Sequence, residues 1–294
     1  MKKILFTTDF STNADKAFCF ALDIAEKHGA ELILAHVFDV PNVFNYPVGY
    51  NPSEMKGEMI KSWQRTLKEF FEHYDTDVQA SFVAVEHPSV VKGILSIIKT
   101  HKPELLVVGT RGKNRIKEAV FGSTTKALVK RSPIPLMAIP EYTNQKSFDK
   151  VLYASDFRED DLLAIKKLVE LVRPYKPEVQ ILHVHPDSEF RGTEKIKWFK
   201  SLIKEHIDYE PVSFEILQSD HVFDTLREHM SMNNFDLLVM LEKERSNILE
   251  KLFHEDLVKK MEFYTWIPLL SYNERFLSVS DTQDVRERDT IEQG

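Results

Sequence analysis

Three of the nine glycines in this 294-residue chain fall within fourteen positions, at Gly109, Gly112 and Gly122. They follow directly on the apolar run 105–108, which has the length and composition of a buried strand. Glycine lets a backbone approach a ligand closely, and we expect positive φ angles at Gly109 and Gly112 where the chain turns off the strand. The spacing therefore indicates a ligand-binding loop, with an ordinary surface loop as the alternative.

Gly122, Ser123 and Thr124 precede or open a segment of helical period that runs to Arg131. The first N–H groups of a helix have no acceptors within the helix, and its dipole favours an anion there. With the two hydroxyl groups as additional donors, this position predicts a phosphate site. The intervening loop is locally basic, with Arg111, Lys113, Arg115 and Lys117 against one acidic residue, Glu118.

The residues that end the first apolar run, 3–8, are the second candidate for chemistry. In open α/β sheets, ligands bind beyond the carboxyl ends of strands where the strand order reverses. Asp9 would lie there and accept hydrogen bonds from ribose hydroxyls or a base amine, and the Val37 backbone would frame the base. The alternative for Asp9 is a turn or helix cap tied to residues 11–13.

The elements that position these residues alternate in type. Short apolar runs are separated by segments of helical period, the pattern of a parallel sheet wound with helices. Apolar residues at helical spacing between 14 and 25, and Met and aromatic residues between 55 and 74, are interpreted as core packing rather than as a cofactor site. The strands are expected at 3–8, 31–38, 78–85, 104–109 and 134–139.

The chain contains an internal repeat. Residues 3–10 return 147 positions later as residues 150–157, and an apolar run that ends in His-Val occurs in each half, at 36–37 and 183–184. The repeat predicts two copies of one domain, with a polar linker between them and a polar tail that is mobile or docks through Phe276 and Leu277. The boundaries are expected at 1–141 for the first domain, 149–272 for the second and 273–294 for the tail.

The second half departs from the first at the glycine window. Its counterpart, 241–254, has no glycine, and three acidic residues balance three basic ones, so we expect no phosphate site there. Asp156 and Val184, the counterparts of Asp9 and Val37, are present in the second half. A zinc site at His183, His185 and Asp187 is conceivable, but the match of His183 to the histidine of the first half favours a structural role.

Composition narrows the classes of partner. The formal net charge is −7, which does not favour nucleic acid or an anionic membrane as a partner. The single cysteine, Cys19, excludes an internal disulfide and indicates a reducing compartment. The apolar run near the start of the chain is too short for the core of a signal peptide, and no apolar run approaches the length of a membrane span. We expect a cytoplasmic protein.

The pattern Gly109-x-x-Gly112, nine residues, Gly122-Ser123 resembles the ATP-binding branch of the universal stress protein family. The opening Ile-Leu-x-x-Thr-Asp-Phe and the closing Ser-Pro-Ile-Pro-Leu agree with it. Both halves carry the resemblance, which implies a tandem member built from two doubly wound five-stranded parallel sheets of the adenine nucleotide alpha hydrolase type, with strand order 3-2-1-4-5.

The resemblance also implies the ligand and the assembly. Asp9 and Val37 would hold the adenosine of ATP, and Gly109, Gly112, Gly122, Ser123 and Thr124 would hold its phosphates, with Mg²⁺ as a companion ion. The last strand of the family commonly pairs two domains, so 134–139 and 267–271 are expected to form an intramolecular pseudo-dimer or the edges of a homodimer.

Motifs of other nucleotide and hydrolase classes do not occur in the sequence. It has no Gly-x-x-x-x-Gly-Lys-Ser/Thr, no Gly-x-Gly-x-x-Gly, no His-x-Gly-His and no Gly-x-Ser-x-Gly. No metal ligands or catalytic residues are predicted. We expect a stress-response regulatory protein that binds ATP in its first domain and presents a surface to an unidentified protein partner. The alternatives are a nucleotide-independent interaction module with a vestigial loop, and a slow ATPase.

Overall fold

The computed structural model describes residues 1–40, 52–110, 122–141, 143, 148–185, 192–242, 267–273 and 276. Strands and helices alternate through both halves of the chain, as predicted. The first half contains β1 (Lys3–Thr7), α1 (Thr12–His28), β2 (Glu31–Phe38), α2 (Pro52–Glu72), β3 (Ala80–Glu86), α3 (Val90–His101), β4 (Leu105–Gly109), α4 (Ser123–Arg131) and β5 (Leu136–Ile139). The second contains β6 (Lys150–Ala154), α5 (Asp160–Val172), β7 (Glu178–His185), α6 (Gly192–His206), β8 (Val212–Gln218), α7 (Val222–Asn233), β9 (Leu237–Glu242) and β10 (Leu269–Asn273).

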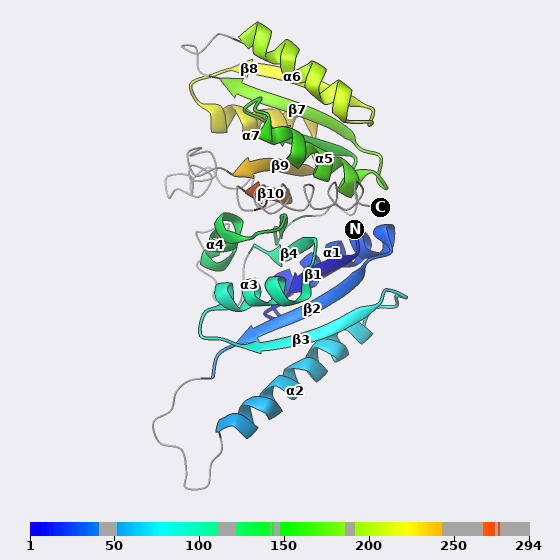
Figure 1. The fold of residues 1–294 in the computed structure, drawn as a ribbon, viewed down its shortest axis with the longest axis vertical. Helices are drawn as coiled ribbons and strands as arrows, with labels where there is room; N and C mark the ends of the chain where they lie inside the picture. The colour runs from blue at the N-terminus through cyan, green and yellow to red at the C-terminus, as the bar shows by residue number, and fades with distance from the viewer. Residues whose placement is uncertain are drawn as a thin grey trace, which may run out of the picture.

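The ten strands of the described residues form one sheet, in the order β3-β2-β1-β4-β5-β10-β9-β6-β7-β8. Each half is parallel and has the predicted strand order 3-2-1-4-5, which confirms the fold class. The expected edge strands meet within the chain: β10 pairs with β5 antiparallel, with Leu269 opposite Ala138. The two expected sheets are therefore halves of one continuous sheet, with β10 near its middle (Figure 1).

Alternation along the strands divides the core into two layers. Ile4 and Phe6 of β1 face one apolar cluster and Leu5 faces the other, because successive strand residues point to opposite faces. Residues of α1, α2, α5 and α6 pack in the first cluster, and residues of α3, α4 and α7 pack in the second. Helices α3 and α4 thus lie together on one face, as Figure 1 shows.

The halves are also joined through α1 and the segment before β6. Phe148 is buried, with its ring centroid 6.2 Å from that of Phe20 and 5.0 Å from that of Tyr175. The Tyr175 hydroxyl donates to Asp23 Oδ2 at 2.6 Å, and His28 Nε2 is hydrogen-bonded to the Leu171 carbonyl at 2.9 Å. The expected polar linker therefore contains one apolar side chain that docks between the halves.

The repeated motif has the same local structure in each half. His36 Nδ1 donates to the Thr8 carbonyl at 2.8 Å, and His183 Nδ1 donates to the Ser155 carbonyl at 2.7 Å. The phenylalanine after each repeated aspartate has positive φ, 57° at Phe10 and 51° at Phe157, which turns its ring onto the histidine. These contacts support the structural role expected for His183.

Neither a metal-ligand cluster nor a membrane-spanning helix occurs in the described part of the chain. Among its residues, no group of three or more His, Cys, Asp or Glu side chains is placed to hold a metal ion, and Asp187 lies outside them. Within the same residues, no helix combines the length and the apolar character that crossing a membrane requires.

Phe276 is buried against Tyr272, as expected for a docked tail, whereas Leu277 lies outside the described residues.

Candidate ligand site at the carboxyl ends of the central strands

The strand order reverses between β1 and β4, which is where open α/β sheets bind ligands. Thr7, the last residue of β1, pairs with Ala35 of β2 and with Val108 of β4. Asp9 lies two residues after Thr7, and Val37 lies two residues after Ala35. Gly109 lies one residue after Val108. The register therefore brings three of the predicted site residues to one edge of the sheet.

Asp9 is half-buried, and its side chain stabilises the turn that follows β1. Its Oδ1 accepts the Ser11 N–H at 3.1 Å, and the hydroxyl of Thr8 accepts the Phe10 N–H at 2.9 Å. These bonds hold the sharp turn from β1 into α1, so the local role considered as the alternative for Asp9 is present. A contact of its carboxylate with ligand stays a prediction.

Val37 is packed from the side of α3. A Cβ atom built on Gly93 would lie 2.5 Å from Cγ1 of Val37, far inside an ordinary carbon–carbon contact. Helix α3 thus rests directly on Val37 because residue 93 has no side chain. Val37 remains half-buried, at the carboxyl end of β2 beside the predicted base subsite.

Gly109 is required for a different reason from the one predicted. Among the described glycines only Gly29 has positive φ, so the predicted positive φ at Gly109 is wrong. A Cβ on Gly109 would lie 2.8 Å from Nδ2 of Asn13, a buried side chain in the first turn of α1. Thr125 of α4 donates to the Gly109 carbonyl at 3.2 Å. The glycine lets α1 approach the end of β4.

Asn13 and Thr125 hold the site from opposite faces of the sheet, and sequence analysis did not assign them. Both are buried polar residues in helices whose other buried residues are mostly apolar. That contrast is the signal that could have identified them, because Asn and Thr are mostly exposed in folded proteins.

Gly122 returns the chain to β4 immediately before α4. Its N–H donates to the Thr110 carbonyl at 2.7 Å, and its own carbonyl accepts the Lys126 N–H at 3.0 Å. Its φ of −62° and ψ of 158° are those of an ordinary N-cap. Ser123 is exposed and Thr124 half-buried at the first turn, so the helix N-terminus opens beside the end of β4.

The remaining predicted residues, Arg111, Gly112 and Lys113, lie outside the described residues, as do positions 243–254 of the counterpart window. At the equivalent edge of the second half, Lys195 of α6 donates to the Asp156 carbonyl at 2.8 Å. Burial lowers the pKa of His183 there, with Lys195 and His185 acting in the same direction, although its hydrogen bond to Ser155 opposes the shift.

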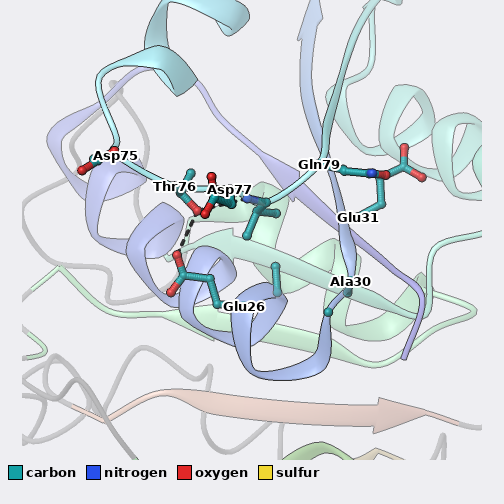
Figure 2. Close-up of a pocket in the computed structure, with 10 residues that line it drawn as sticks. Glu26, Ala30, Glu31, Asp75, Thr76, Asp77 and Gln79 are labelled. Carbon is teal, nitrogen blue, oxygen red and sulfur yellow. Dashed lines mark hydrogen bonds between the residues drawn. The ribbon is translucent and has the colours of Figure 1, made fainter.

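A pocket of about 610 Å³ lies at the opposite end of the first-half strands, between α1, the start of β2 and residues 75–79 (Figure 2). Four of its lining side chains are acidic: Glu26, Glu31, Asp75 and Asp77. Thr76 closes one side by donating to Glu26 Oε1 at 2.9 Å. This charge disfavours an anionic ligand, and the pocket is remote from the edge that carries Asp9 and Gly109.

Comparison with known proteins agrees with the fold and with the family resemblance of the sequence. The Universal stress protein family model matches residues 1–140. Universal stress protein MJ0577 of Methanocaldococcus jannaschii is 26% identical over 156 residues, which cover 47% of this chain and 94% of that protein. The universal stress protein of Aquifex aeolicus is 40% identical over 76 residues, 24% of this chain and 56% of that one.

A solved structure shows the same fold along nearly the whole chain. A universal stress protein of Archaeoglobus fulgidus superposes with a TM-score of 0.67 at 19% identity, over 92% of this chain and 98% of that one. The family-model match covers the half with the glycine pattern, and the structural match extends into the second half. Residues 1–140 therefore belong to the universal stress protein family, and the chain as a whole shares the fold of one of its solved members.

Proposed function

We propose that the first half of this protein binds ATP at the carboxyl ends of β1, β2 and β4, and that the protein acts as a nucleotide-binding regulator of the stress response. The observation that carries the proposal is the pair of hydrogen bonds that join the start of α4 to the end of β4 and the residue after it. Thr125 bonds to Gly109, the last residue of β4, and Gly122 bonds to Thr110 just beyond it, so the anion-attracting end of α4 opens beside the same edge as Asp9.

Each predicted residue has a role in this proposal. Asp9 and Val37 contact the adenosine, while the N–H groups and hydroxyls of Ser123 and Thr124 bind phosphate oxygens. Gly109 and Gly122 bring the backbone close, and the loop residues Arg111, Gly112 and Lys113 supply donors and positive charge. Mg²⁺ prefers oxygen ligands, which the phosphates and the two hydroxyls offer.

The second half is proposed not to bind the triphosphate. Its counterpart window has neither glycine nor excess positive charge. The Lys195 side chain already donates to the backbone at Asp156, at the edge where the first half offers Asp9. We therefore expect one ATP per chain and an intramolecular role for the second half.

Titration calorimetry with ATP and Mg²⁺, on protein stripped of nucleotide, tests the proposal. Asp9→Ala and Gly122→Glu should abolish binding, the second because a carboxylate at the start of α4 repels phosphate. Asp156→Ala is the matched control, the repeat position in the second half, and should bind like wild type.

No binding at millimolar ATP would refute the proposal and favour an interaction module that does not use nucleotide. Two ATP per chain would show that the second half binds triphosphate. Sustained phosphate release that Asp9→Ala abolishes would instead identify a slow ATPase.

A further inference from the structure

Asn273, the last residue of β10, reaches from the second half of the chain to α4 of the first. It is 4% exposed, and its Nδ2 donates to the carbonyls of Val129 at 3.0 Å and Ser132 at 2.7 Å. Its Oδ1 accepts the Phe276 N–H at 3.2 Å, which determines which end of the amide faces the helix. One side chain therefore makes three buried hydrogen bonds.

The two carbonyls belong to the carboxyl end of α4. The last carbonyls of a helix have no donors within it, and a buried carbonyl left without a partner is costly. Asn273 supplies these donors from the second half, more than 130 positions along the chain. The end of α4 is thus completed by a residue that the first half does not contain.

Helix α4 is held at both ends. At its start, Thr125 bonds to the end of β4 and Gly122 bonds to Thr110 just beyond that strand, at the candidate phosphate site. Its nine residues span about 13 Å at 1.5 Å per residue. Leu128 is buried in the same apolar cluster as Leu269 of β10. A shift of β10 would therefore move a short, packed helix rather than be absorbed by a loop.

The residue equivalent to Asn273 in the first half cannot make the same contact in the reverse direction. Residues 134–137 match 267–270 in the internal repeat, which places Pro140 opposite Asn273 in the sequence comparison. Proline carries no side-chain hydrogen-bond donor. The asymmetry favours the half that has the glycine pattern, which is the half proposed to bind nucleotide.

We propose that Asn273 is a positioning residue for the phosphate subsite: through it, the second half holds the N-terminus of α4 in place, and ATP binding and the docking of β10 stabilise each other. This inference rests on the proposed function. The coupling is reciprocal by linkage, so whatever weakens the Asn273 contact lowers ATP affinity, and ATP strengthens the contact.

Asn273→Ala tests the inference against Tyr175→Phe. The control removes another hydrogen bond between the halves, from Tyr175 to Asp23 of α1, that has no link to α4. Both variants should unfold at lower urea concentration than wild type. Only Asn273→Ala should raise the Kd for ATP, by roughly tenfold, the equivalent of about 1.4 kcal/mol. Its Kd for adenosine, which has no phosphate, should stay within about twofold of wild type.

Hydrogen exchange in the wild-type protein provides a second measurement, which holds even where Asn273→Ala does not fold. The Phe276 N–H, which donates to Asn273, should exchange more slowly with ATP present, and no more slowly with adenosine. Equal loss of ATP affinity in both variants, equal loss for ATP and adenosine, or unchanged Phe276 exchange would overturn the positioning role. If wild type binds no ATP, the proposed function fails and this inference fails with it.

Discussion

Val37 and Gly93 form the contact whose energetics can be worked out most directly. An alanine at position 93 places its Cβ 2.5 Å from Cγ1 and 3.0 Å from Cγ2 of Val37, whereas carbon atoms normally meet at about 3.5–4.0 Å. Gly93 is inside α3 and Val37 is on the strand beneath, so neither atom is the far end of a flexible chain. We predict that Gly93→Ala destabilises the protein and displaces Val37.

The magnitude follows from opposing terms. Overpacking costs about 1–3 kcal/mol. Alanine gains about 1 kcal/mol over glycine inside a helix. The net free energy of unfolding should fall by about 1 kcal/mol. Val37→Ala, which removes two methyl groups from a half-buried site, should cost about 1 kcal/mol as well.

The double variant Gly93→Ala/Val37→Ala should be nearly as stable as wild type. It removes the methyl groups that the new Cβ overlaps and keeps the gain in helix propensity. The expected coupling energy is about 1–3 kcal/mol in the stabilising direction. Urea unfolding of all four proteins measures it. Gly57→Ala in α2, where a Cβ meets nothing within 4 Å, is the control and should stabilise by about 1 kcal/mol.

Additivity of the two substitutions within about 0.5 kcal/mol would refute this reasoning. It would mean that α3 moves away from β2 at little cost, so that Val37 is not held by the helix. ATP titration of the same proteins adds the functional test, since the single Gly93→Ala variant should bind more weakly than the double variant if the displaced Val37 side chain blocks the base subsite.

Two further predictions concern stability: one tests the packing at Gly109, and the other tests the protonation of His183. Gly109→Ala should cost about 1–3 kcal/mol in urea unfolding, because its Cβ would lie 2.8 Å from Nδ2 of the buried Asn13; a variant as stable as wild type would contradict the close approach of α1 and β4. Burial lowers the pKa of His183 in the folded protein below its ordinary 6.5, so the unfolded chain takes up the proton first and stability should fall as the pH drops through 6.5 toward the folded value. His183→Asn, which keeps a donor for the Ser155 carbonyl, should flatten the dependence of the urea midpoint on pH between about 7 and 5; an unchanged slope would assign it to other groups.

The strands, and the meeting of three candidate residues at one edge of the sheet, were predictable because they follow local rules. Apolar runs predicted the five first-half strands to within two residues of their observed bounds. Parallel topology then determined that Asp9, Val37 and Gly109 would meet at one edge. The reason for glycine at position 109 was not predictable, because spacing alone does not distinguish a positive φ from a lack of room for a side chain.

Contacts between distant residues were the part that sequence could not supply. Nothing in residues 129–132 or in Asn273 alone indicates that they meet, since the contact depends on the antiparallel pairing of β5 with β10. Phe148 shows the same limit: one apolar residue in a polar stretch has no periodicity to mark it as buried. Its position between Phe20 and Tyr175 follows only from the docking of the halves.

Comparing the two halves of the repeat distinguishes residues that stabilise the fold from residues expected to bind the ligand. The turn after each first strand recurs in both halves, with positive φ at Phe10 and Phe157 and a histidine bonded to the strand end. A feature present in both halves cannot by itself explain a ligand expected in only one. What differs between them is the glycine pattern that ends at Gly122, and Asn273 in place of proline. Substitutions of Phe10 and Phe157 in the repeated turn should therefore act on stability, whereas those at Gly122 and Asn273 should change ATP affinity.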